Sequence, residues 1–128
     1  MKLLFTLLAI ILLPNILLAV MTTPNIDPSK VRYGNYSTFD ATKNHLVGVV
    51  DSVKVYSEIP AYKTIKKEKL EKGTARYTQL MFECTKQFRA SLSKVATSGK
   101  YKLIVEVGGV SGYPSTNVMG LAVKYLNG

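Results

Sequence analysis

The sequence offers very few side chains of the kinds that carry out catalysis or bind metals. His45 is the only histidine and Cys84 the only cysteine, and they lie far apart in the chain. A zinc site needs several closely spaced ligands, and a serine–histidine–aspartate triad could use only His45, near which no nucleophile motif occurs. Gly108-Gly109 lacks the helix and lysine that follow a phosphate loop, and is typical of a turn. We therefore expect no catalytic residue, no metal site, no cofactor and no enzymatic activity.

The remaining reactive groups also favour structural roles. Cys84 falls on the apolar stripe of an expected helix, which predicts a buried and inert thiol. The acidic residues are scattered, and Glu68 and Glu71 lie among lysines. This pattern indicates ion pairs on a helix face rather than an acid–base couple. The sequence thus points to a binding protein.

A one-sided run of cations is the main chemical feature of the chain. Only Glu68 and Glu71 oppose them within the run. One interpretation is a solvated helix face that keeps the protein soluble. The other is a surface that binds clients or anions, because lysine stems cover apolar surface while the ammonium groups stay in water. The candidate binding residues are Lys63, Lys66, Lys67, Lys69, Lys72 and Arg76.

The net charge of the whole chain narrows the kinds of partner. The formal charge is +9 at pH 7. Such a protein is attracted to anionic lipid, lipopolysaccharide, acidic polypeptides or nucleic acid. An exported protein rarely meets nucleic acid, so we expect envelope surfaces or protein clients and no nucleic-acid partner.

Helical segments must position these cations. Pro60 is a favourable first residue of a helix, and Gly99 is a favourable terminating residue. Between them, Gly73 leaves two alternatives: one long helix, or a helical hairpin over about 60–98. We favour the hairpin because both halves carry an apolar face that needs a partner. The stripe on the second half consists of Tyr77, Met81, Cys84, Phe88, Leu92 and Val95.

Apolar runs on either side of the hairpin predict a small sheet. Strands are expected at about 46–51 and 101–107, both rich in β-branched residues. A third strand, at about 110–113, is expected to return after the Gly108-Gly109 turn. A last helix, at about 117–126, is apolar around most of its circumference and should be buried. The expected fold class is α+β, a sheet body with a projecting hairpin and a C-terminal helix.

The N-terminal part resembles an export signal followed by a polar connection. Lys2 precedes an apolar run, 3–13, and a small residue lies near position 19. This pattern predicts a signal peptide over 1–19 and a periplasmic protein, with an uncleaved membrane anchor as the alternative. Residues 20–45 show no helical or strand period and predict a flexible polar lead-in. The folded domain is expected over 46–128.

The order of these elements resembles the Skp/OmpH family of periplasmic chaperones. Over 49–63, a strand ends in Val-Asp, a short helix follows, and Ser-x-x-Pro-Ala opens a longer helix. Residues 88–96 resemble the family's returning helix, and 101–105 its Tyr-Asp-Leu-Val-Leu strand. Residues 109–113 and 117–127 resemble the next strand and the closing helix. The resemblance covers about 46–127, with a shorter arm than the family has.

The resemblance implies both an assembly and a function. Each subunit of a homotrimer would give strands to a central β-body, and helical arms would hold unfolded outer-membrane or other envelope proteins. This holdase activity needs no ATP site. The alternative is a non-catalytic envelope scaffold that binds anionic lipid or polysaccharide through the same basic face.

Overall fold

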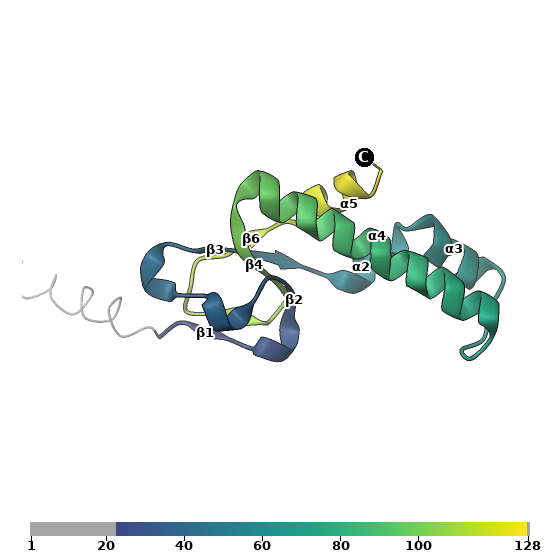
Figure 1. The fold of residues 1–128 in the computed structure, drawn as a ribbon, viewed down its shortest axis with the longest axis horizontal. Helices are drawn as coiled ribbons and strands as arrows, with labels where there is room; N and C mark the ends of the chain where they lie inside the picture. The colour runs from purple at the N-terminus through teal and green to yellow at the C-terminus, as the bar shows by residue number, and fades with distance from the viewer. Residues whose placement is uncertain (1–22, 128) are drawn as a thin grey trace, which may run out of the picture.

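A pair of parallel strands forms the centre of the protein. The structure is a computed structural model that describes residues 23–127, so the signal peptide predicted over 1–19 lies outside the described residues. Strand β3 (Leu46–Val50) pairs in parallel with β4 (Tyr101–Glu106), and the chain between them forms the helical part (Figure 1). Both strands are rich in Val, Ile and Leu, as buried parallel strands usually are. The two strands expected here are confirmed.

Two further strands complete a four-stranded sheet with the order β2-β4-β3-β6. Strand β2 (Val31–Tyr33) runs antiparallel to β4, and β6 (Thr116–Asn117) runs parallel to β3. A separate antiparallel pair consists of β1 (Asn25–Ile26) and β5 (Val110–Ser111). The expected α+β fold class is confirmed.

The expectation for the third strand needs correction. The strand predicted at about 110–113 is only Val110–Ser111, and it pairs with β1 rather than returning beside β4. Strand β4 has no free edge, because β2 and β3 occupy its two sides. The backbone N–H of Asp27 also donates to the Gly109 carbonyl at 2.9 Å, which joins the turn to the N-terminal segment.

The prediction of a flexible lead-in over 20–45 is wrong for residues 23–45, the part that the structure describes. This segment supplies β1 and β2, and Ile26 is buried against Leu103 and Val105. Its pairing partners lie 71 to 86 positions later in the chain, from Tyr33 opposite Ile104 to Asn25 opposite Ser111. Such long-range pairing leaves no local period in the sequence.

A repeated Asx-x-Ser/Thr pattern gives the rest of this segment its order. Three copies each begin a 3₁₀ helix: Pro28–Lys30, Tyr36–Thr38 and Ala41–Lys43. In each copy the Asx side chain accepts hydrogen bonds from the later residue's backbone N–H and hydroxyl, pairing Asp27 with Ser29, Asn35 with Ser37 and Asp40 with Thr42. These bonds hold the pKa of Asp27 and Asp40 below their ordinary values.

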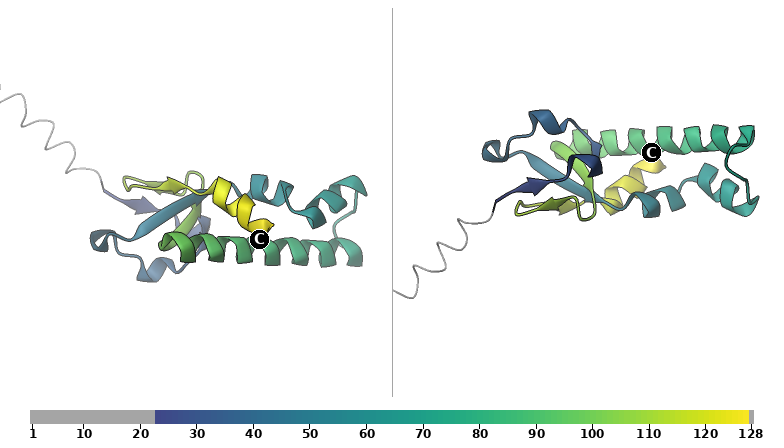
Figure 2. Two further views of the ribbon diagram at one scale, coloured as in Figure 1. Left: turned by 90° about the horizontal axis from the view of Figure 1, so that it is seen from above. Right: turned by 90° about the horizontal axis from the view of Figure 1, so that it is seen from below.

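The chain between β3 and β4 forms the predicted helical hairpin. Helix α2 (Ser52–Ser57) starts at its cap Asp51, and α3 (Pro60–Lys67) starts at a proline. Helix α4 (Ala75–Gly99) starts at its cap Thr74, has 25 residues and returns the chain to the sheet (Figure 2). The single long helix is excluded.

The basic run was expected to lie on the helices of the hairpin, but part of it lies in a non-helical connection at the tip. Helix α3 ends at Lys67, and Lys69 and Gly73 have φ values of 52° and 91°. These left-handed conformations cannot continue a helix. Lys69 and Lys72 therefore lie in the connection rather than on a helix face.

Helix α5 (Met119–Leu126) packs on one side of the hairpin but is less buried than expected. The helix predicted over 117–126 starts two residues later because Thr116–Asn117 pairs with β3. Ala122 is its one buried residue, and Leu121 is 38% exposed. Among residues 23–127, no helix has the length and apolar character that crossing a membrane requires.

Two apolar cores lie on opposite faces of the sheet. Ile104 faces the helices, where it belongs to the same cluster as Val50 and Leu92. Its neighbours Leu103 and Val105 point the other way, because successive strand residues alternate. Cys84 is buried in the helical core as predicted. The sheet therefore anchors the base of the hairpin and leaves its far end projecting.

Candidate binding groove on the helical hairpin

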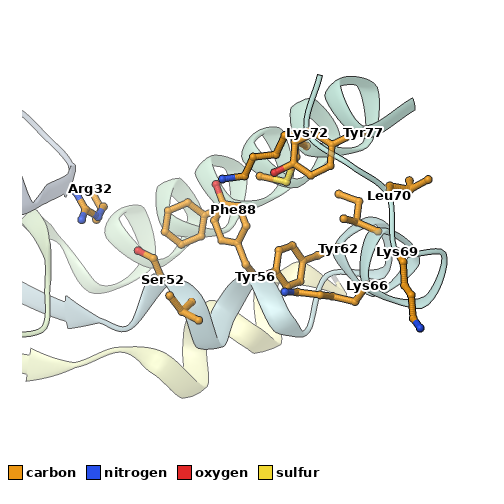
Figure 3. Close-up of a pocket in the computed structure, with 13 residues that line it drawn as sticks. Arg32, Ser52, Tyr56, Tyr62, Lys66, Lys69, Leu70, Lys72, Tyr77 and Phe88 are labelled. Carbon is orange, nitrogen blue, oxygen red and sulfur yellow. The ribbon is translucent and has the colours of Figure 1, made fainter. Parts of the chain in front are cut away.

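An open groove of about 800 Å³ runs along the hairpin, between α4 on one side and α2 and α3 on the other. We call it the hairpin groove. Its lining is mostly apolar or aromatic and includes the cations Arg32, Lys66, Lys69 and Lys72 (Figure 3). The lining residues are Arg32, Ser52, Val53, Tyr56, Tyr62, Ile65, Lys66, Lys69, Leu70, Lys72, Tyr77, Met81 and Phe88.

Aromatic side chains from three helices form the floor of the hairpin groove. The ring centroids of Tyr56 and Phe88 lie 5.0 Å apart, and those of Tyr56 and Tyr62 lie 6.1 Å apart in an edge-to-face arrangement. Such pairs prefer these geometries. The Tyr56 hydroxyl lies 3.3 Å from Thr85 Oγ1. Tyr56 therefore has a fixed position at the centre of the floor.

Three lysines, from α3 and the connection after it, line the hairpin groove. The Lys66 ammonium lies 5.4 Å from the centre of the Tyr62 ring, a cation–π contact. Lys69 and Lys72 extend from the tip connection (Figure 3). In the described part of the chain, none of these three lysines has a carboxylate within ion-pair distance. Their charge is thus available to an anionic partner.

A carboxylate network fixes the base of the hairpin groove. Glu106 accepts hydrogen bonds from Arg32 Nε at 3.1 Å and from the Ser52 backbone N–H at 2.9 Å. The Ser52 hydroxyl also donates to the Glu106 carboxylate. The carboxylate lies at the N-terminus of α2, where the helix dipole favours negative charge. This network ties β2, β4 and α2 together beneath the groove.

A second, smaller hollow continues the apolar surface across α4. It is lined by Thr78, Met81, Phe82, Thr85, Lys86 and Arg89, and we call it the Phe82 shelf. Met81 belongs to both surfaces. Phe82 is 70% exposed, which is unusual for so large an apolar side chain. Lys86 and Arg89 place a second set of cations on the α4 side.

The candidate cations of the sequence divide into two groups. Lys66, Lys69 and Lys72 line the hairpin groove, whereas Lys63, Lys67 and Arg76 do not. Lys63 Nζ lies 3.8 Å from Glu58, and Arg76 donates to Glu68 at 2.7 Å. These two pairs follow the ion-pair interpretation of the basic run, although Glu58 was not among the expected partners.

Several residues of this surface have little or no signal in the sequence. Tyr77, Met81 and Phe88 belong to the predicted apolar stripe, but the stripe alone does not reveal that part of it lines an open groove. Arg32 comes from the segment to which no structure was assigned. Phe82 is off the stripe, and an isolated Phe beside Lys86 and Arg89 was the only available signal.

The remaining reactive residues have structural surroundings. Burial raises the pKa of the Cys84 thiol. His45 Nδ1 accepts a hydrogen bond from the Asp40 backbone N–H at 3.0 Å, and its ring lies 5.8 Å from that of Phe39. Within residues 23–127, no three His, Cys, Asp or Glu side chains gather where they could hold a metal ion.

Comparison of the chain with models of protein families, with curated proteins and with solved structures gives no match.

Proposed function

We propose that the protein is a holdase-type chaperone of the cell envelope, of the Skp/OmpH kind, that binds unfolded outer-membrane or other envelope proteins. The observation that carries the proposal is the hairpin groove, where Tyr56, Tyr62 and Tyr77 stay partly exposed beside lysines that have no carboxylate partner within residues 23–127. Unfolded polypeptides expose the apolar and acidic groups that such a surface would cover.

The two kinds of side chain in the groove would contribute differently to binding. Apolar contact contributes about 25 cal/mol for each Å² removed from water and does not require one client sequence. The cations Lys66, Lys69 and Lys72 would attract acidic segments and speed their association. Binding of this kind is reversible and needs no nucleotide.

The topology supports the proposed kinship. The strands before and after the hairpin, β3 and β4, lie side by side in one sheet, so the hairpin projects from a β-body. The arm is short, because α3 has only eight residues. A client would therefore lie along the hairpin groove one segment at a time, rather than inside a deep cage.

An aggregation assay with an unfolded outer-membrane protein tests this function. The variant Lys66→Glu/Lys69→Glu/Lys72→Glu reverses the charge of the three groove lysines. The matched control Lys43→Glu/Lys94→Glu/Lys124→Glu makes the same charge change elsewhere on the surface. Exposed ion pairs contribute about 0.2–1 kcal/mol each, so the groove variant should bind about tenfold more weakly. The control should suppress aggregation like the unmodified protein.

The same proteins separate the holdase from the envelope scaffold that binds anionic lipid. A scaffold would leave the client to aggregate and would sediment with vesicles of anionic phospholipid. Equal loss of suppression in both triple variants would mean that net charge, and not the hairpin groove, controls the activity.

A further inference from the structure

The two sides of the hairpin are filled differently. On one side α5 lies against α4, and the Ser91 hydroxyl donates to the Ala122 carbonyl (Figure 2). On the other side, Thr85 of α4 contacts Tyr56, and the hairpin groove is open. Residues six positions apart on an α-helix point about 120° from each other, which places Thr85 and Ser91 on separate faces of α4. In the described part of the chain, the hairpin thus holds a helix on one face, whereas no helix or strand covers the groove on the other.

The open face has the length of a short helix. Tyr77 and Phe88 mark its two ends on α4. At 1.5 Å per residue they are separated by about 16 Å, which corresponds to about three turns of a docked helix. For comparison, α5 on the opposite face has eight residues.

Cations lie on both sides of this face. Lys66 lies on α3, Lys69 and Lys72 follow it in the tip connection, and Lys86 and Arg89 lie on α4 at the Phe82 shelf. None of the five belongs to an ion pair within residues 23–127. An apolar strip with cations on either side is complementary to an apolar strip with carboxylates on either side.

A helix suits this floor better than an extended chain does. The floor around Tyr56, Met81 and Phe88 is mainly apolar, and the Tyr56 hydroxyl already faces Thr85. An extended segment pressed onto it would lose water from backbone N–H and C=O groups without gaining partners. A helix satisfies its own backbone and presents only side chains to the floor.

We propose that the hairpin groove binds an amphipathic helix whose apolar face is flanked by acidic residues, so that the bound segment becomes a third helix on the hairpin. The proposal rests on the proposed function, because it names the kind of client segment that the groove recognises. A client segment would fold into a helix as it docks, in the helix-in-groove mode.

Three labelled peptides test the proposal on the unmodified full chain. The first has about 14 residues, with leucines at helical spacing and flanking glutamates, and is only marginally helical alone. The second carries prolines at two central positions, which remove backbone donors and break a helix. The third has lysines in place of the glutamates. Fluorescence anisotropy should give at least tenfold weaker binding for the second and third, and circular dichroism should show helix formation only for the first.

A variant of the Phe82 shelf tests whether the cations on α4 contribute to binding of the helical peptide. Lys86→Glu/Arg89→Glu changes exposed residues and should weaken the first peptide several-fold, whereas Lys94→Glu/Lys124→Glu should not. Equal binding of the first and second peptides overturns helix docking, whether or not the protein suppresses aggregation. Tight binding of the first peptide without any suppression of aggregation contradicts the holdase function and supports a dedicated helical partner.

Discussion

At the scale of single residues, Glu106 connects the sheet to the hairpin. Its side chain is only 18% exposed and accepts hydrogen bonds from a guanidinium, a helix N-terminal N–H and a hydroxyl. Hydrogen bonds to charged groups are stronger than neutral ones. The orientation of α2, and with it of Tyr56 in the groove floor, therefore depends on this carboxylate.

Replacing Glu106 with glutamine should lower the free energy of unfolding by about 1–3 kcal/mol, because the amide keeps one acceptor and loses the charge that holds Arg32 and Ser52. Urea denaturation followed by circular dichroism measures the loss. The control is Glu83→Gln, since Glu83 is exposed on α4 and has no ion pair in the described structure. Equal stability of the two variants would contradict a structural role for Glu106.

At the scale of elements, α5 depends on one buried polar contact. Ser91 is 1% exposed and donates to the Ala122 carbonyl. The variant Ser91→Ala should destabilise the protein by about 1 kcal/mol and speed amide exchange within α5. Hydrogen exchange with mass spectrometry measures this, with the exposed Ser93→Ala as control. Binding of the acidic helical peptide should stay unchanged because the groove lies on the other face of α4. Amide exchange in α5 that is equal in Ser91→Ala and the unmodified protein would contradict a stabilising role for the Ser91–Ala122 hydrogen bond.

Patterns of neighbouring residues predict the strands and helices whose formation depends mainly on those neighbours. The β-branched runs around Val49 and Ile104 and the Pro60 and Gly99 signals located β3, β4 and the hairpin to within one or two residues. The N-terminal strands were missed because Ile26 and Val31 gain their burial and pairing from residues near the other end of the chain. No window of the N-terminal sequence contains that information.

The groove could be predicted only in part for the same reason. The lysine run identified Lys66, Lys69 and Lys72, but the left-handed backbone at Lys69 that places two of them at the tip has no sequence signal. The apolar stripe identifies Tyr77 and Met81 without showing that both stay partly exposed in an open groove. Which side of α4 is covered depends on where α5 docks, and that is a property of the tertiary structure.

At the scale of the whole molecule, the sheet leaves exposed edges and apolar side chains. Within residues 23–127, strands β2 and β6 each have one unpaired side, and β6 is exposed along its length. Leu46 and Tyr36, both in the sheet half of the chain, are 50% and 45% exposed. Open sheet edges favour pairing with other chains unless they are covered. Assembly through the body would cover these edges while leaving the hairpins free.

We therefore expect the homotrimer that the Skp/OmpH resemblance implies. Light scattering after size exclusion should give three times the mass of one chain, and the melting temperature should rise with protein concentration because assembly stabilises the folded chain by mass action. Three hairpin grooves on one particle would raise the apparent affinity for a long client without any new contact. A single-chain mass and a melting temperature independent of concentration would contradict the trimer, and client binding would then have to arise from one groove alone.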